Sequence, residues 1–309
     1  MIVSLKDRRV RRAIMSSVSL AWRVEIFLLV YAGFIFLLYK HYSVKWIAIP
    51  STAVSVMGIA LSIFLGFRNS AAYDRWWEAR KIWGGVVNES RTFSMSVLSM
   101  MSEPEGAKKE QLQKHQKNLI YRHLAYINAL RLQLREQDSW DELAPFLSKQ
   151  EQKKLASAKN KATLLNHWQG QQLKELREKG FLSEFQHIEL NQSLREFYAL
   201  QGKCERIKKT PLPRYYSYFT LVFLWLFFFI LPFTLVKDLG IVTLPVCLIV
   251  TFVFNVIEAS GRYTEDPFEN RATDTPMTAL CRTIEIDLRQ LLEEEELPEP
   301  TQPINYVLM

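Results

Sequence analysis

Cysteine is scarce in this chain, with three copies among 309 residues and no CxxC pair. A disulfide scaffold and a cysteine-based zinc site are therefore excluded. Glycine is also scarce, with 11 copies, and none stands in the GxGxxG or GxxxxGKS/T spacing of phosphate-binding loops. The HExxH and GxSxG patterns of metalloproteases and serine hydrolases are absent as well. We therefore expect neither an enzyme nor a bound metal or cofactor.

Long runs without charge are the main feature that is present. About 20 apolar residues in a helix cross the hydrocarbon core of a bilayer. The candidate spans cover residues 26–39, 46–67, 215–236 and 241–257. The first run is short, and it reaches a spanning length only if the helix continues upstream past Arg23 and Glu25. These two charges also argue against a cleaved signal peptide, so we predict four transmembrane helices.

Basic residues gather on one side of these spans. They precede the first span, follow the second and precede the third, whereas the opposite loops carry only Lys40, Lys45 and Lys237. The positive-inside rule then places both termini and the long middle segment in the cytoplasm, and we expect the inner membrane of a bacterium. The same asymmetry explains the net charge of +7 without a nucleic-acid partner.

The spans divide the chain into four predicted segments. These are a cytoplasmic N-terminus with the first two transmembrane helices (1–67), a cytoplasmic helical region (68–214), the third and fourth transmembrane helices (215–257) and a cytoplasmic C-terminal segment with a tail (258–309). The middle region is polar and helical in period. Two of its apolar faces must be buried: Leu119, His123, Leu124, Ile127 and Leu130, and Leu190, Leu194, Phe197 and Leu200. We expect Pro211 to end the last helix of this region.

Three large apolar residues of the second span fall on one helical face. At 100° per residue, Ile63 lies about 40° and Phe67 about 80° from Ile59, so the three side chains form a column. Ser62 and Gly66 lie on the same side. Periodicity by itself favours close packing of this face against another helix. The alternative is that several copies surround an axis, where rings of these side chains gate ions by losing their water.

Three motifs stand beside the predicted spans. They are SIFLGFRNSAAYDRWWEARKIWGG (62–85), GKCERIKKTPLPRYY (202–216) and EDPF (265–268). In their order and in their positions relative to four hydrophobic segments, they resemble the bestrophin family, including its bacterial members. The resemblance marks as pore-adjacent or structural the residues Ser62, Gly66, Arg68, Arg75, Trp76, Trp77, Glu78, Glu205, Arg206, Pro211, Pro213, Asp266, Pro267 and Phe268.

This resemblance implies an all-α membrane protein that assembles as a homopentamer around one central pore. In that family the second span lines a narrow apolar neck, and matching through the LGF motif places the neck on Ile59, Ile63 and Phe67. The family has a second constriction at the cytoplasmic exit. Counting back from the CERI motif places it at Ile188, with Phe185 as a neighbouring alternative.

The sequence departs from animal bestrophins where they bind calcium. Those proteins carry an acidic cluster after the PF motif, whereas residues 269–273 here read ENRAT. Six or more oxygen ligands are hard to collect from this segment, so we expect no calcium site and no calcium dependence. The sign of selectivity stays open at this stage. Arg68 beside the neck favours anions, whereas Glu265 and Asp266 favour cations.

We therefore expect a passive pentameric ion channel that contacts the lipid bilayer and conducts monovalent ions through a hydrophobic neck gate. Chloride is the first expectation and a monovalent cation such as sodium the second. The alternative from another class is a membrane-anchored helical protein for interaction or signalling. A secondary transporter is disfavoured, because the candidate charges within spans, Glu25 and Glu258, lie only at span ends.

Overall fold

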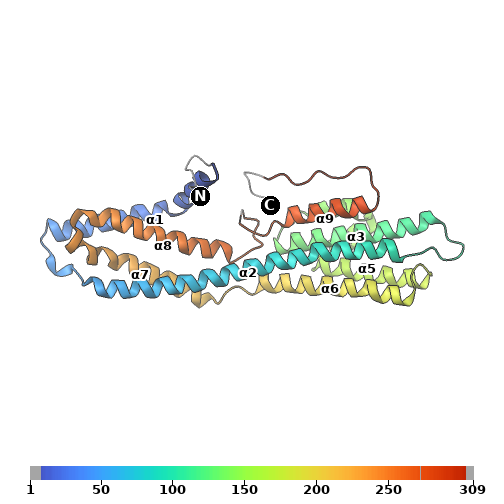
Figure 1. Cartoon of the computed structure of the whole chain (residues 1–309), viewed down its shortest axis with the longest axis horizontal. Helices are drawn as coiled ribbons and strands as arrows, with labels where there is room; N and C mark the ends of the chain where they lie inside the picture. Colours follow the sequence, from blue (N-terminus) through green and yellow to red (C-terminus); the bar gives the residue numbers. More distant parts are fainter. Residues whose placement is uncertain (1–7, 272, 304–309) are drawn as a thin grey trace, which may run out of the picture. The chain divides into compact units, whose positions relative to one another are not determined.

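The computed structural model describes the backbone of residues 8–271 and 273–303. The extreme ends of the predicted N-terminal and C-terminal segments, residues 1–7 and 304–309, lie outside the described residues. So do the side chains of residues 8–21, 53 and 214. All regular structure in the described part is helical, which confirms the all-α prediction there (Figure 1).

The chain forms two compact units. The first, which we call the span unit, contains Met1–Asp74 and Pro211–Glu265. The second, which we call the polar unit, contains Arg75–Thr210 and Asp266–Met309. Each unit therefore joins segments that are distant in the sequence, and each is described by itself below.

The span unit is built from long apolar helices. Its elements are α1 (Arg8–Lys40), η1 (Lys45–Ile47), the first half of α2 (Ser51–Met100), α7 (Arg214–Leu239), η3 (Gly240–Val242) and α8 (Thr243–Thr264). Helix α1 packs against both α7 and α8, and these two pack against each other. Helix α7 ends at Leu239, and the next residue, Gly240, has a φ of 52°, a positive value that glycine adopts without strain.

Three stretches of described residues are long and apolar enough to cross a membrane, by length and composition alone. They are Trp22–Lys40, Val54–Met100 and Tyr215–Thr264, and the third contains both α7 and α8. Helix α1 does continue upstream of residue 26, as a spanning first helix requires. Helix α2 differs from the prediction at both ends. It begins at Ser51, after Pro50, and it continues to Met100 instead of ending near residue 67.

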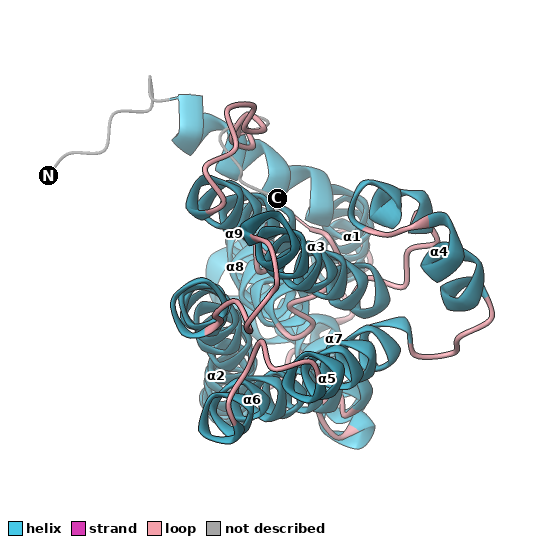
Figure 2. Cartoon of the chain, turned by 90° about the vertical axis from the view of Figure 1, so that its right-hand side faces the viewer, coloured by secondary structure: helices cyan, strands magenta, loops and turns pink. Residues whose placement is uncertain are grey.

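The polar unit is a bundle around one apolar core. Besides the second half of α2, it contains α3 (Lys109–Leu134), η2 (Trp140–Phe146), α4 (Lys149–Ala156), α5 (Lys161–Glu178), α6 (Glu184–Lys209) and α9 (Met277–Leu291). Helix α3 packs against α5 and α9, and α5 packs against α6; Figure 2 views this bundle end-on. Capping boxes begin two of the helices, Ser148 with Glu151 at α4 and Ser183 with Gln186 at α6.

The core of the polar unit confirms the two predicted apolar faces. All nine residues of those faces are buried. Fully buried Trp83 and Phe93 of α2 belong to the same core as Phe197 of α6. Helix α6 ends at Lys209, directly before Thr210 and Pro211, as the proline predicts. This core needs no membrane, because its apolar residues face one another.

Candidate functional site

The predicted neck column lies on an open face of α2. The side chains of Ile59, Ile63 and Phe67 are 63%, 54% and 67% exposed. On the opposite face, Leu61 and Leu65 are buried in the core of the span unit. Helix α2 therefore packs with one side, and the three column residues share the other side, as a rotation of 100° per residue requires.

Contacts with α7 hold α2 in this orientation. The ring of Phe64 stacks on Tyr216 with 5.2 Å between centroids, and Phe223 meets Phe64 edge-on at 6.1 Å. Gly58 lies against Phe227, where a Cβ atom at position 58 would come within 3.3 Å of the Phe227 ring. The aromatic residues of α7 thus fix which face of α2 stays open.

The two small residues beside the column make the open face smooth. Ser62 donates its hydroxyl to the carbonyl O of Gly58 at 2.7 Å, which satisfies the hydroxyl within the helix. Gly66 is exposed, and a Cβ atom there would meet nothing within 4 Å. Neither residue fills the space around the three large side chains.

The charges that follow the column are paired with one another. Arg68 is 2% exposed, and its guanidinium lies 3.1 Å from Glu258 and 3.4 Å from Glu265. Sequence reasoning had placed Arg68 and Glu265 as opposing candidates for attracting anions and cations. The structure instead joins them inside the span unit. Asp266, with a side chain 44% exposed, lies 3.8 Å from Arg75 in the polar unit.

Three motif residues, Arg75, Glu78 and Arg206, meet in the polar unit at the C-terminal end of α6. Arg75 donates to the carbonyl oxygens of Ile207 and Thr210, which the end of a helix leaves without intrahelical partners. Glu78 forms an ion pair with Arg206 at 2.5 Å. The indole of Trp76 donates to the carbonyl O of Thr273 at 2.8 Å.

The other motif residues have packing or hydrogen-bonding positions. Glu205 accepts hydrogen bonds from Gln133 at 3.1 Å, Asn160 at 3.1 Å and Gln201 at 2.8 Å. Phe268 is buried in the core of the polar unit. The structure places the others as follows: Trp77 beside Trp76, Pro211 between α6 and α7, Pro213 at the N-terminus of α7, and Pro267 with its carbonyl O accepting from Thr275.

Both candidates for the second constriction are exposed on α6. Ile188 is 58% and Phe185 86% exposed, whereas Leu190 and Phe197 of the same helix are buried. Large apolar side chains this exposed are uncommon on the polar unit. Both residues remain candidates on this face.

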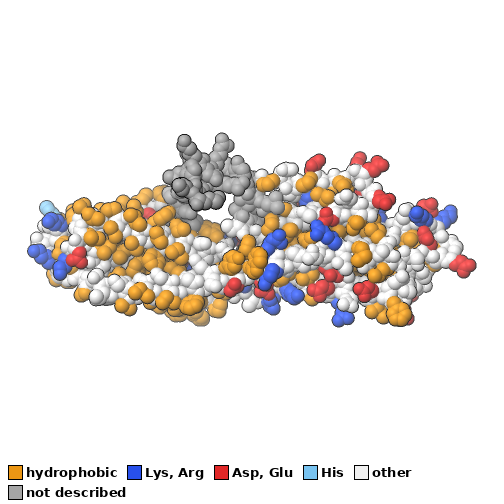
Figure 3. All heavy atoms as spheres, in the orientation of Figure 1, with side chains coloured by type: hydrophobic (Ala, Val, Ile, Leu, Met, Phe, Trp, Pro, Cys, Tyr) orange, Lys and Arg blue, Asp and Glu red, His pale blue; other side chains and the backbone are white. Residues whose placement is uncertain are grey.

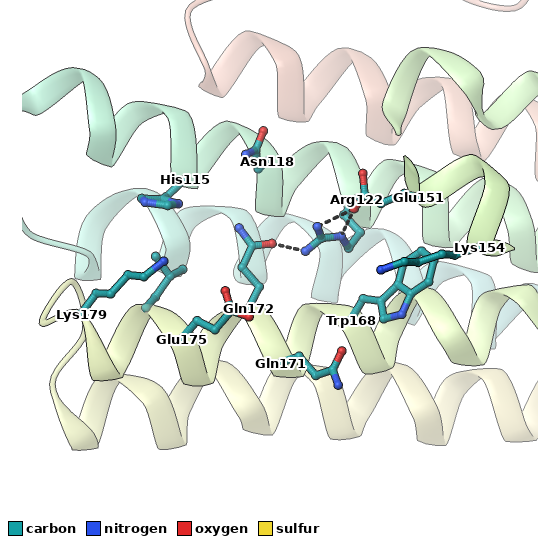
Figure 4. A pocket seen from close by; sticks show the side chains of 11 residues that line it. His115, Asn118, Arg122, Glu151, Lys154, Trp168, Gln171, Gln172, Glu175 and Lys179 are labelled. Atoms are coloured by element: carbon teal, nitrogen blue, oxygen red, sulfur yellow. Dashed lines mark hydrogen bonds and ion pairs between the residues drawn. The ribbon is translucent and has the colours of Figure 1, made fainter. Parts of the chain in front are cut away.

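A polar groove of about 350 Å³ lies between α3, α4 and α5 (Figure 4). Arg122 crosses it and donates to Glu151 and Gln172. Burial opposes ionisation of Glu151, but hydrogen bonds from Ser148 and Arg122 outweigh it and lower the pKa of this carboxyl. The groove was not anticipated from sequence, although the S-x-x-E capping box marks one wall. Because Glu151 already neutralises Arg122, we assign these contacts to holding the helices together and no catalytic role to the groove.

Titratable residues elsewhere in the polar unit also serve packing. His123 is completely buried, and its Nε2 lies 2.8 Å from the hydroxyl of Ser90. Burial lowers the pKa of His123 to about 3, so the ring is neutral. Among the described residues, no three His, Cys, Asp or Glu side chains are grouped to hold a metal ion.

Comparison with known proteins finds similar chains in one family. The family described as "Bacterial/Fungal Bestrophin protein" matches residues 1–290. "Voltage-dependent anion channel-forming protein YneE" of Escherichia coli (strain K12) is 33% identical over 86% of this chain and 83% of that protein. "Voltage-dependent anion channel-forming protein mll4386" of Mesorhizobium japonicum is 31% identical over 86% of this chain and 82% of its own length. The crystal structure of a bacterial bestrophin homologue from Klebsiella pneumoniae superposes with a TM-score of 0.81 at 28% identity, covering 88% of this chain and 98% of that one.

Proposed function

This chain belongs to the bacterial and fungal bestrophin family, and from that premise we propose that it is a passive anion channel of a bacterial inner membrane. Relatives that share about a third of its residues are named anion channel-forming proteins. The observation that carries the proposal is the open column of Ile59, Ile63 and Phe67 on α2. The predicted division into spans and cytoplasmic segments, with both termini cytoplasmic, is part of the proposal.

The column gains a function only when several copies of the chain assemble. An apolar face with small residues beside it suits either lipid or an axis shared with other copies. Only the second arrangement makes a path for ions, and we assign it to a homopentamer. Five copies would then present five Ile59, five Ile63 and five Phe67 side chains as stacked rings.

Such rings act as a gate through water and not through charge. A narrow ring of isoleucine or phenylalanine offers no hydrogen bonds, so an ion that sheds hydration water there rises in free energy and is held back. Slight widening lets water enter, and slight narrowing expels it. Apolar rings carry no sign of charge, so chloride is proposed from the relatives, and a monovalent cation such as sodium is the second candidate.

A second constriction is proposed in the polar unit, at Ile188 of α6. Its exposure is typical of a residue that contacts other copies or lines a path. Phe185, three residues earlier and more exposed, is the alternative at this place.

Planar-bilayer recording of the purified protein in asymmetric NaCl tests the function. Unitary currents that reverse close to the chloride equilibrium potential support the proposal, and reversal at the sodium potential assigns cations instead. We expect Ile63→Ala and Phe67→Ala to raise unitary conductance several-fold by widening and wetting the neck. Ile249→Ala is the matched control, because Ile249 of α8 is 63% exposed but lies off the column.

Two outcomes contradict the proposal. One is the absence of current both in the wild type and in the triple variant with alanine at Ile59, Ile63 and Phe67. The other is a monomer in chemical cross-linking of native membranes. Either result favours the membrane-anchored interaction protein, for which the exposed Phe185 and Ile188 would be the binding surface.

A further inference from the structure

Arg68 follows the last residue of the column but points into the span unit. Consecutive residues of a helix are 100° apart, and this rotation separates Phe67, which is 67% exposed, from Arg68, which is 2% exposed. Nη1 of Arg68 lies 3.1 Å from Oε1 of Glu258, and Nη2 lies 3.4 Å from Oε2 of Glu265. Both carboxylates come from the segment formed by α8 and the residue after it.

The next residue of α2 contacts the same helix. Asn69 donates its side-chain amide to the carbonyl O of Ile257 at 2.9 Å. A Cβ atom at Gly261 would clash with Oδ1 of Asn69, so the two helices approach more closely here than a side chain at 261 allows. Arg68 and Asn69 therefore join α2 to α8 immediately after the column.

The joint places charged groups in a unit that is mostly apolar. Glu258 is 4% exposed and also lies 3.5 Å from the exposed Arg262, so two carboxylates face two guanidinium groups. Removing charges from water is costly, and the remaining partner of a broken buried pair is strongly destabilised. A buried pair adds little net stability over apolar residues, but it fixes geometry because only one arrangement satisfies every charge.

We propose that Arg68, Glu258 and Glu265 form an ionic lock that holds α2 on α8 and so sets the position of Phe67 in the neck. This inference rests on the proposed function for its link to the neck. Arg68 is then a positioning residue, and it contributes to gating through Phe67 without attracting anions itself. Asn69 and Gly261 allow α2 and α8 to approach each other closely at the same place.

The lock and an anion-attracting role for Arg68 predict different results. If Arg68 acts through the lock, Arg68→Gln and Glu258→Gln each change open probability about tenfold or more, because each removes the most buried ion pair of the joint and unbalances its charge. The ratio of chloride to sodium permeability stays the same. The double variant Arg68→Gln with Glu258→Gln lies closer to the wild type in open probability than either single variant, since it removes both members of the pair and leaves the net charge unchanged.

Arg262→Gln is the matched control for these recordings. Arg262 contacts the same carboxylate, but its side chain is 56% exposed, so its loss leaves open probability within about twofold of the wild type. The proposal is overturned if Arg68→Gln alters the permeability ratio while Glu258→Gln leaves gating unchanged, because Arg68 would then act on ions directly.

A chemical readout separates failure of the lock from failure of the proposed function. In a Phe67→Cys background, Arg68→Gln should change the rate of labelling by a small methanethiosulfonate at least threefold, and Ile249→Cys should show no such change. The native cysteines at 204, 247 and 281 are buried and give a low background. This measurement needs folded protein but no current. An unchanged labelling rate at position 67 overturns the lock whatever the recordings show, and a changed rate supports it even if no current is found.

Discussion

The two units place the same kinds of side chain in opposite environments. In the span unit, Trp46 is 85%, Tyr215 77% and Ile249 63% exposed, and Figure 3 shows apolar side chains covering the visible face of α1 and α8. In the polar unit, Trp83 and Phe197 are fully buried, and charged side chains are scattered over the visible surface of its helices. The difference is the one expected between a lipid-facing unit and a water-facing unit.

Two ion pairs show the reverse, although both units bury some charged side chains. The span unit buries the Arg68 and Glu258 pair, whereas the pair of Arg91 and Asp287 in the polar unit is 50% and 31% exposed. Large apolar side chains that are exposed on the polar unit depart from this pattern. Phe185 and Ile188 are apolar and exposed where water is the solvent, so they need a partner or a path. The column of α2 is not exceptional by exposure, because lipid would also cover it.

The largest effect should come from burial in the polar unit. We expect Phe197→Ala to lower the free energy of unfolding by about 3–5 kcal/mol, since it empties a site between Phe93, His123 and Tyr126. Phe185→Ala on the same helix is the matched control and should cost less than about 0.5 kcal/mol. Urea unfolding followed by circular dichroism measures both, and equal losses would break the comparison between buried and exposed apolar residues.

A smaller effect depends on pH through His123. The hydroxyl of Ser90 donates to the carbonyl O of Val86 at 2.6 Å, so His123 donates through Nε2 and a second proton on Nδ1 finds no acceptor. The pKa of His123 is about 3 in the folded protein, against 6.5 for an ordinary exposed histidine, so the unfolded chain binds more protons between these values. The free energy of unfolding therefore increases with pH in this window. Acidification from pH 7.5 to 5 should lower it by about 2 kcal/mol.

The His123→Phe variant isolates that contribution. Phenylalanine fits among the same aromatic rings and does not titrate, and Ser90 keeps its bond to Val86. Unfolding midpoints of wild type and variant should differ in their slope against pH between 5 and 7.5 and run parallel above it. Identical slopes would mean that another group carries the pH dependence.

Within the span unit, the two buried carboxylates should differ. Glu25 accepts from Asn255 at 2.6 Å and lies 2.7 Å from the hydroxyl of Thr251, which also reaches the carbonyl O of Cys247 at 2.9 Å. An amide can replace the carboxyl here, because Thr251 can accept from it while donating to Cys247. Glu25→Gln should cost less than about 1 kcal/mol in detergent unfolding, against about 3–5 kcal/mol for Glu258→Gln. Equal costs would remove the distinction between the two sites.

The smallest effect should come from a surface ion pair. Arg91→Gln removes the contact with Asp287, but solvent screens both groups, so the loss of stability should stay below about 0.5 kcal/mol and vanish at high salt. Unfolding midpoints at low and high NaCl check this. A loss comparable to that of Glu258→Gln would show that exposure does not govern the strength of these pairs.

Much of the fold was predictable because it depends on local pattern. Helical period located the buried faces around Leu124 and Phe197, and Pro211 marked the end of α6. The continuity of α2 from Ser51 to Met100 was not predicted. A loss of hydrophobicity marks where a membrane span ends, but it does not end a helix when no proline or cap follows. For the same reason, the boundary between the units falls inside α2 without a break.

By itself, the sequence determined the apolar runs, the buried helical faces, the column of Ile59, Ile63 and Phe67 and the family that its motifs resemble, since these follow from spacing along one chain. The tertiary structure decided the partners. It turned Arg68 away from the column toward Glu258, which is 190 residues away, and it brought Arg75 and Trp76 to residues 207–210 and 273. A charge and its distant partner leave no periodic trace in a single sequence, because which of many carboxylates Arg68 meets depends on how the helices pack.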